Sequence, residues 1–265
     1  MGVLNVTPDS FYDGGRYHKS DDAVAQALRM AEEGADIIDV GGESTRPYSD
    51  LLPVDEELKR VIPVIEILSR EIDLPISIDT YKSEVVRQAL EAGAAMVNDI
   101  SALRFDPAIG NVVAATGVPI VLMHMRGTPK NMQINPIYDD LLGEIVDFLH
   151  GAAEKAVSMG IKRELIIIDP GIGFGKSFDD NLTILRDLGR FSSLGYPILV
   201  GTSNKSFIGH VLGVPAESRD TGTMATIAAA VMNGAHIIRA HNVRAAKETV
   251  TIIDAIKAGS SAPLS

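Results

Sequence analysis

Three segments of this chain repeat one pattern, and this repetition limits the possible folds more than any other feature. Residues 34–39, 93–98 and 234–239 each run from glycine through two apolar residues to a polar one. Each segment is typical of a helix that ends at glycine, a short buried strand, and a polar residue at the end of that strand. Five further apolar runs of strand length lie at residues 3–6, 76–78, 119–123, 165–168 and 198–200. The chain therefore contains eight predicted buried strands.

Helical periodicity fills the intervals between these strands. Apolar residues recur at three- and four-residue spacing in residues 24–31, 61–68, 85–90, 145–156, 226–230 and 246–253. Ser20, Asp21 and Asp22 predict the cap of the first helix. The acidic run Asp55-Glu56-Glu57 predicts the solvated first turn of the second.

Strand and helix alternate along all 265 residues, with a period of roughly 30 residues. This alternation predicts an α/β protein with a single (β/α)8 TIM barrel, whose active site lies at the C-terminal ends of the strands. An open, doubly wound parallel sheet is the alternative. No linker divides the chain, so we expect residues 1–258 to form the barrel and residues 259–265 a C-terminal tail.

Composition excludes several classes of function. The net charge of −11 disfavours a general nucleic-acid surface, so an anionic substrate must be held by local cations, backbone N–H groups or a metal. The absence of cysteine rules out disulfides and cysteine-ligated zinc, and it fits a reducing cytoplasm. The chain has no apolar run of membrane-spanning length and no signal-peptide pattern at its start. We therefore expect a cytoplasmic enzyme with neither nucleic-acid nor membrane partners.

Polar residues follow every predicted strand. In chain order the strand ends carry Asn5, Glu43, Asp79, Asn98, His124, Asp169, Lys205 and Arg239. Each has an ordinary explanation by itself: an aspartate is often a helix cap, and a histidine can pack at the edge of a core. Because the carboxyl ends of barrel strands converge, the whole set instead predicts one active site.

Several segments resemble the signatures of the dihydropteroate synthases. The first two are Met1-Gly2-Val3-Leu4-Asn5-Val6-Thr7-Pro8-Asp9-Ser10-Phe11 and Gly42-Glu43-Ser44-Thr45-Arg46-Pro47. Residues 77–82, 97–101, 123–129, 169–176, 205–209 and 239–243 follow in the order of the family. The resemblance spans essentially the whole chain. It implies a transferase of folate biosynthesis that condenses 6-hydroxymethyl-7,8-dihydropterin diphosphate with 4-aminobenzoate to give 7,8-dihydropteroate and diphosphate.

The resemblance also implies roles around the pterin diphosphate. Asp169 and Asn98 would read the donors and acceptors on the pterin edge, and Lys205 would donate to ring acceptors. Asp79 would stabilise the positive charge that develops as the carbon–oxygen bond breaks. Arg239 would offset the charge of the leaving diphosphate.

The metal and the remaining catalytic group follow from the same resemblance. His241 would assist with the diphosphate, and Asn5 would bind the cofactor Mg2+. The expected catalytic residues are thus Asp79, Lys205, Arg239 and His241.

The second substrate has its own predicted set. Thr45, Arg46 and Pro47 from the second loop, with Phe174 and Ser206, would bind 4-aminobenzoate, and sulfonamides would compete there. The resemblance further implies a homodimer.

One departure from the family keeps alternatives open. Asn204 stands where the family usually has arginine, beside the aminobenzoate side of the site. A catalytically silent pterin-binding relative, or one that uses another amine, is therefore an alternative. A pterin-dependent methyltransferase domain is a second, although Lys205, Ser206 and the loop at residues 44–47 favour the synthase.

Overall fold

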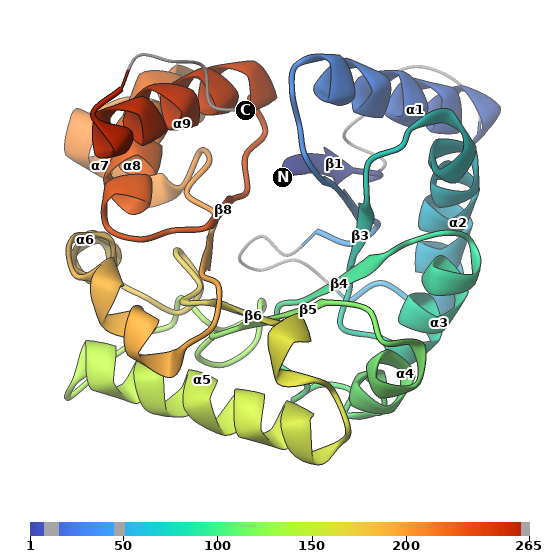
Figure 1. The fold of residues 1–265 in the computed structure, drawn as a ribbon, viewed down its shortest axis with the longest axis horizontal. Helices are drawn as coiled ribbons and strands as arrows, with labels where there is room; N and C mark the ends of the chain where they lie inside the picture. The colour runs from blue at the N-terminus through green and yellow to red at the C-terminus, as the bar shows by residue number, and fades with distance from the viewer. Residues whose placement is uncertain (8–15, 45–50, 261–265) are drawn as a thin grey trace.

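The computed structural model describes residues 1–7, 16–44 and 51–260. In this part of the chain, eight short strands lie at the centre and the helices form a ring outside them (Figure 1). The strands are β1 (Gly2–Asn5), β2 (Ile38–Gly41), β3 (Ile76–Asp79), β4 (Met96–Asp99), β5 (Ile120–Met123), β6 (Ile166–Asp169), β7 (Leu199–Val200) and β8 (Ile237–Ile238). The helices are α1 (Arg16–Glu32), α2 (Val54–Glu71), α3 (Ser83–Glu91), α4 (Ala108–Thr116), α5 (Leu141–Ser158), α6 (Phe178–Arg186), α7 (Ser206–Leu212), α8 (Asp220–Met232) and α9 (Val243–Ala258).

The strands follow one another in ring order. β1 to β6 form one parallel ladder, and β7 pairs with β8 in parallel. Single parallel bridges join the two ladders at both seams, from Ile168 to Ile198 and from Gly2 to Ala240. This sequential order confirms the predicted (β/α)8 barrel, and the doubly wound alternative is wrong because that fold reverses its strand order midway.

Side chains of alternate residues point to opposite sides of the strands. Those on the outer side, such as Ile38, Ile78 and Leu122, pack against the helices in the largest apolar cluster. Those on the inner side form a smaller cluster that fills the barrel, built on Met96, Val121, Ile167 and Leu199 with Met1, Ile37 and Ile237 against them. The barrel interior is therefore a packed core.

The structure corrects two predictions about helix starts. α1 begins at Arg16, so Ser20, Asp21 and Asp22 lie inside the helix, with both aspartates exposed, and do not cap it. Glu57 is fully buried, because it lies on the same face of α2 as Val61 and points toward the strands.

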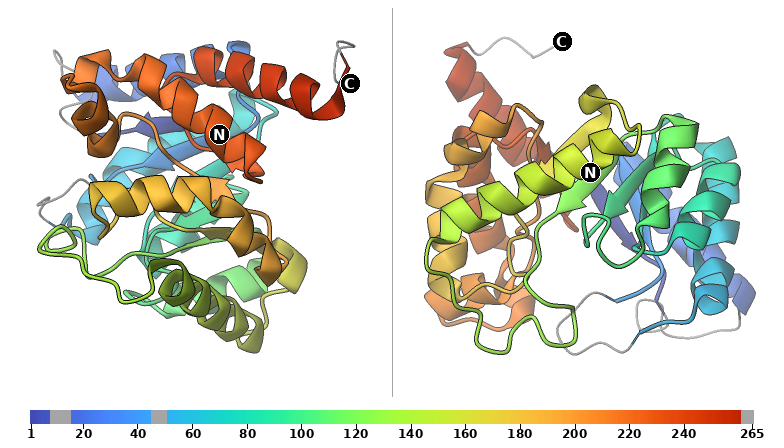
Figure 2. Two further views of the ribbon diagram at one scale, coloured as in Figure 1. Left: turned by 90° about the vertical axis from the view of Figure 1, so that its left-hand side faces the viewer. Right: turned by 90° about the horizontal axis from the view of Figure 1, so that it is seen from below.

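The two ends of the barrel differ. The green loop that follows β5 projects from the end at which the strands finish (Figure 2).

At the C-terminus, α9 ends at Ala258 and Gly259 takes the left-handed conformation that terminates helices, with φ of 62°. Within the described residues, no helix combines the length and apolar character needed to cross a membrane.

Candidate active site

Strand alternation places four polar side chains next to the apolar core inside the barrel, on the side of the carboxyl ends of the strands. Asp39, Asn98, Asp169 and Arg239 each lie two residues beyond an inner apolar residue, namely Ile37, Met96, Ile167 and Ile237 in that order. A shift of two residues keeps the same side of the strand and moves one layer toward its carboxyl end. The polar layer therefore follows directly from the local sequence.

Arg239 organises this layer. Its Nε donates to Asp39 Oδ2 at 2.6 Å, and its Nη2 donates to Asp79 Oδ2 at 2.7 Å. Asn98 Nδ2 donates to the same Asp39 oxygen at 3.0 Å. Burial lowers the pKa of Arg239, but Asp39 and Asp79 outweigh it and raise that pKa above the usual value. The guanidinium is thus a permanent cation held between two carboxylates.

The two carboxylates each keep one oxygen outside this network. Asp39 Oδ1 and Asp79 Oδ1 are buried and have no hydrogen-bond partner among the described residues. Burial raises the pKa of Asp79 to about 7, even though Arg239 opposes the shift. An unpartnered buried oxygen is costly, so both atoms are acceptors available to N–H groups of a ligand.

Asp169 provides a third buried carboxylate, at the end of β6. Its Oδ1 accepts from the backbone N–H of Gly171 at 2.7 Å, and the residue is 6% exposed. Burial raises its pKa to about 6, against the hydrogen bond from Gly171 and the nearby lysines. Asp169 is therefore charged at neutral pH and becomes neutral in mild acid.

Lys205 lies beside this carboxylate, at the start of α7. Its ammonium stands 4.1 Å from the centre of the Phe174 ring, a cation–π contact. Burial lowers the pKa of Lys205 to about 8. A Cβ on Gly173 would lie 2.9 Å from Lys205 Cδ, so glycine at that position allows the lysine to cross the loop.

The other predicted site residues are at the edge of this group. Asn5 ends β1 and is half-buried, in register with Gly41, which is in turn in register with Asp79. His241 is exposed, with Nδ1 2.9 Å from Ser203 Oγ. Ser206 is exposed at the first position of α7. The predicted aminobenzoate residues Thr45, Arg46 and Pro47 lie outside the described residues.

Asn204, the departure from the family pattern, has a left-handed backbone with φ of 58°. Its carbonyl accepts from Arg219 Nη1 at 2.9 Å, and its N–H donates to Thr223 Oγ1 at 3.2 Å. Asparagine adopts this conformation more readily than arginine. The backbone turn before Lys205 therefore suits the residue that is present.

A partly buried ion-pair cluster holds the two residues on either side of the second loop. Lys82 Nζ donates to Glu43, to Glu57 and to the carbonyl of Leu52, while the N–H of Leu52 donates to Glu43 Oε1. Tyr81 OH also donates to Glu43, at 2.6 Å. Glu43 and Leu52 stand just outside residues 44–51, so Lys82 fixes both ends of the segment that contains the predicted aminobenzoate residues.

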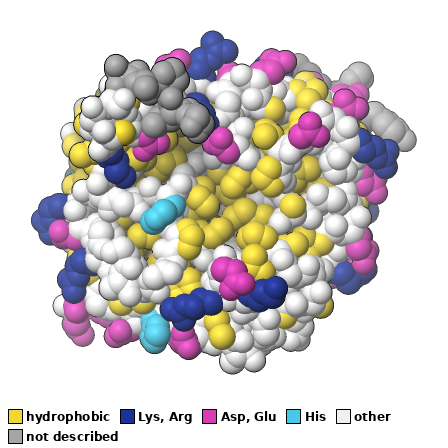
Figure 3. Space-filling model, viewed as in Figure 1, with side chains coloured by type: hydrophobic (Ala, Val, Ile, Leu, Met, Phe, Trp, Pro, Cys, Tyr) yellow, Lys and Arg dark blue, Asp and Glu magenta, His cyan; other side chains and the backbone are white. Residues whose placement is uncertain are grey.

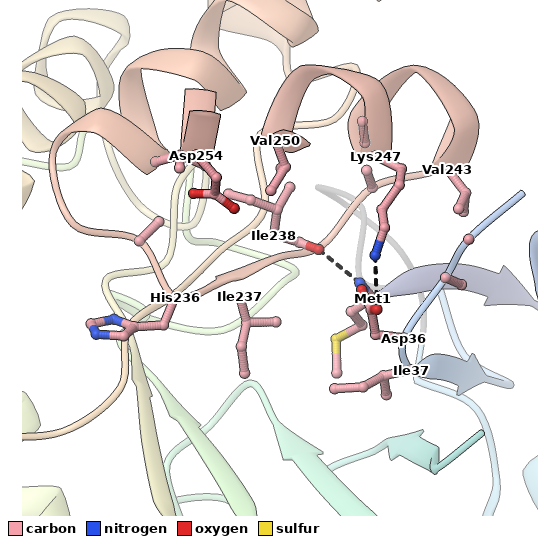
Figure 4. Close-up of a pocket in the computed structure, with 16 residues that line it drawn as sticks. Met1, Asp36, Ile37, His236, Ile237, Ile238, Val243, Lys247, Val250 and Asp254 are labelled. Atoms are coloured by element: carbon pink, nitrogen blue, oxygen red, sulfur yellow. Dashed lines mark hydrogen bonds and ion pairs between the residues drawn. The ribbon is translucent and has the colours of Figure 1, made fainter. Parts of the chain in front are cut away.

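A cavity of about 320 Å³ lies at the opposite end of the barrel. Its lining includes Met1, Ile37 and Val250, with a Lys247–Asp36 ion pair of 2.9 Å at its edge (Figure 4). Seen from this end, hydrophobic side chains gather in the middle of the face (Figure 3). The polar strand-end residues face the other way, so this cavity is not the candidate active site.

Sequence reasoning omitted Asp39 from the site, although the signal was present. Asp39 occupies the same position in its repeat as Asn98 and Arg239 do in theirs. Because both were predicted to lie in the active site, this position implies that Asp39 lies there too. The cluster of Lys82, Glu43 and Glu57 had no such signal, because residues far apart in the chain form it.

Comparison with known proteins identifies the family of this chain. The sequence profile of the family described as "Pterin binding enzyme" matches residues 1–241. The dihydropteroate synthase of Synechocystis is 49% identical, over 97% of this chain and 89% of the relative. The dihydropteroate synthase of Xanthomonas albilineans, solved with 4-aminobenzoic acid, superposes with a TM-score of 0.92 at 47% identity, over 97% of this chain and 92% of that one. The Yersinia pestis enzyme, solved with a sulfonamide drug, has a TM-score of 0.92 at 44% identity, over 97% and 94%. The chain therefore belongs to the dihydropteroate synthases, transferases of folate biosynthesis within the pterin-binding enzyme family.

Proposed function

We propose that this chain joins 6-hydroxymethyl-7,8-dihydropterin diphosphate to 4-aminobenzoate through the residues of its polar strand-end layer. The observation that carries the proposal is the pair of buried, unpartnered oxygens Asp39 Oδ1 and Asp79 Oδ1 beside Arg239. A pterin edge presents several N–H donors, which such acceptors would satisfy.

Recognition of the pterin would rest on both hydrogen-bond acceptors and hydrogen-bond donors of the protein. The carboxylates of Asp79 and Asp169 accept hydrogen bonds, and the carboxamide of Asn98 can accept through its oxygen while its nitrogen donates to Asp39. Lys205 donates from the side of Phe174. A site that pairs buried donors and acceptors with a ligand rejects analogues that lack those groups, because unpaired buried groups are costly.

The reaction itself is a displacement at the pterin methylene carbon. The carbon–oxygen bond to the diphosphate breaks, the electron pair leaves with that oxygen, and the amine nitrogen supplies the new bond and then loses a proton. Positive charge develops on the pterin during this step, and the carboxylate of Asp79 stabilises it. Arg239 orients Asp79 and contributes a fixed positive charge near the leaving group.

The leaving diphosphate requires further positive charge. His241 lies at the end of β8 with one ring nitrogen on Ser203. Asn5 ends β1 and is half-buried, and a single amide oxygen completed by water and phosphate oxygens suits Mg2+. We therefore assign Asn5 as the protein ligand of Mg2+, which would supply Lewis-acid charge to the diphosphate.

The second substrate would bind on the side of Phe174 and Ser206, with Thr45, Arg46 and Pro47 from the second loop. The complexes of the two relatives with 4-aminobenzoic acid and with a sulfonamide drug support this substrate and this inhibitor class for the present chain. The N–H groups at the start of α7, beside Ser206, can receive a carboxylate.

The working form of the protein is proposed to be a cytoplasmic homodimer. Large apolar side chains are exposed on the outer helices, among them Val211 and Leu212 of α7 and Met232 at the end of α8. Burial of such side chains against a second copy would stabilise a dimer. The lack of cysteine suits a reducing compartment.

Diphosphate release from 6-hydroxymethyl-7,8-dihydropterin diphosphate tests the proposal, with and without 4-aminobenzoate and with Mg2+ or EDTA. Release that requires the amine and yields dihydropteroate would support it. Binding of the pterin diphosphate without amine-dependent release would instead favour a silent relative or another amine, the alternative raised by Asn204.

A further inference from the structure

Lys176 is a buried cation that has no part in the reaction proposed above. It follows the glycine loop of residues 171–175 and is 2% exposed, the largest fully buried side chain among the described residues. Its Nζ lies 3.1 Å from the carbonyl oxygen of Phe174, 2.9 Å from His124 Nδ1 and 3.4 Å from the carbonyl oxygen of His124. An ammonium has three N–H donors, so each has an acceptor.

The charge states of the pair agree with this arrangement. Burial, reinforced by the positive charge of Lys176, lowers the pKa of His124 to about 2, so the imidazole is neutral. A neutral ring can accept at Nδ1 when its proton is on Nε2. Burial lowers the pKa of Lys176 to about 7, while Asp169 opposes the shift. Below pH 7 Lys176 is therefore an ammonium, which can only donate, and His124 accepts.

The loop that Lys176 contacts has one backbone hydrogen bond of its own, from the Phe174 N–H to the Gly171 carbonyl at 3.1 Å, and one from the Gly173 N–H to Asn181 Oδ1 at 2.6 Å. Gly171, Gly173 and Gly175 all have positive φ, of 72°, 82° and 66°. Its backbone is fixed from outside: Gln133 donates to the carbonyl of Gly173, and Tyr138 donates to the carbonyl of Gly175. Gln133, Tyr138 and His124 all belong to the segment after β5. Lys176 therefore makes the most buried of the hydrogen bonds that join the loop after β5 to the loop after β6.

Both ends of the glycine loop reach the site. The N–H of Gly171 holds Asp169 Oδ1, and the ring of Phe174 lies under the ammonium of Lys205. We infer that Lys176 is a positioning residue, whose contacts with Phe174 and His124 set the places of Asp169 and Lys205. The inference rests on the proposed function for its kinetic test, but not for its structural one.

Two substitutions remove the hydrogen bond between Lys176 and His124, one by removing the donor and the other by removing the acceptor. Lys176→Met keeps the length of the stem without the ammonium, and His124→Leu removes the acceptor. His124→Asn is the conservative partner of the second, because the asparagine oxygen can take the place of Nδ1. We expect kcat/KM for the pterin diphosphate to fall at least tenfold in Lys176→Met and His124→Leu. His124→Asn should recover most of the loss.

The matched control is Phe191→Leu, at a fully buried position of the 3-10 helix Leu188–Leu194. Any melting-temperature loss that it shares with the test variants measures general destabilisation. Hydrogen exchange followed by mass spectrometry gives the structural readout. Amides of residues 171–176 should exchange at least tenfold faster in Lys176→Met and His124→Leu than in Phe191→Leu.

The tautomer of His124 gives a test that needs no activity and no Lys176 variant. In 15N-histidine-labelled protein, the signals missing from His124→Asn belong to His124. They should show a neutral ring protonated at Nε2 below pH 7 and down to pH 5, where Lys176 is an ammonium. A ring protonated at Nδ1 would overturn the inference, and so would kinetics and exchange in His124→Leu equal to those of Phe191→Leu. If the wild type makes no dihydropteroate, exchange and NMR still decide the positioning role.

Discussion

Asp39 offers the sharpest test of the buried network, because one of its oxygens carries two hydrogen bonds. Oδ2 accepts from Arg239 Nε at 2.6 Å and from Asn98 Nδ2 at 3.0 Å, and the residue is 0% exposed. Asp39→Asn keeps the shape and one acceptor oxygen but removes the charge. The substitution therefore isolates the electrostatic part of the contact.

The expected loss follows from these contacts. A buried hydrogen bond to a charged group contributes about 1.5–3 kcal/mol, and one between neutral groups about 0.5–1.5 kcal/mol. In Asp39→Asn the bond from Arg239 keeps its charged donor but loses its charged acceptor, which should lower the free energy of unfolding by about 1–2 kcal/mol. For a chain of this size that corresponds to a fall in melting temperature of roughly 2–8 °C. Asp39→Ala should cost more, about 3–5 kcal/mol, because the guanidinium loses its partner.

Asp36→Asn is the matched control, three residues earlier in the chain. Asp36 pairs with Lys247 at 2.9 Å, but its side chain is 74% exposed. Exposed pairs contribute little, so the control should change the melting temperature by no more than about 2 °C.

Two assays complete the test: thermal unfolding followed by circular dichroism, and diphosphate release at saturating amine. We expect Asp39→Asn to lower kcat at least tenfold, because Arg239 would no longer be fixed from both sides. Equal melting temperatures for Asp39→Asn and Asp36→Asn would refute the buried network. Unchanged kcat in Asp39→Asn would refute its role in orienting Arg239.

Three further predictions concern the rest of the site. Burial raises the pKa of Asp79 to about 7 and that of Asp169 to about 6, so both lose their charge as the pH falls. The kcat/KM for pterin diphosphate should therefore decrease below pH 7, and Asp79→Asn should remove the part of that decrease centred near pH 7. The same substitution should slow turnover far more than it weakens pterin binding. Equal losses in turnover and binding would contradict the charge-stabilising role of Asp79. Asn204→Arg should lower the free energy of unfolding by about 1 kcal/mol in chemical denaturation, because φ there is 58°. The same substitution should lower KM for 4-aminobenzoate. An unchanged free energy of unfolding would mean that the backbone tolerates either residue. Lys82→Met should cost about 3–5 kcal/mol in the same assay and raise KM for the amine more than for the pterin, whereas Lys59→Met, at an exposed pair, should change neither.

Much of the fold was predictable from local sequence. The apolar run and the polar residue that ends it lie next to each other in the chain, and strand alternation by itself assigns Ile167 to the filled interior and Asp169 to the layer above it. The regular alternation of strand and helix predicted parallel strands, and the observed strand order then selected the barrel over the doubly wound alternative. The repeated glycine segments even pointed to Asp39, through its equivalence with Asn98 and Arg239.

Only the tertiary structure decided which charges meet. Arg239 lies 200 residues from Asp39 and 160 from Asp79, and closure of the barrel brings all three together. Glu57 looked like a solvated helix start, because sequence shows the acidic run but not the half-buried Lys82 that the helix face meets. Lys176 reads locally as an ordinary charged residue after a glycine loop, and only the packing of the β5 loop around it makes it a buried donor to His124. Sequence periodicity fixes which side of a strand a residue takes, whereas contacts between strand ends depend on how the whole ring closes.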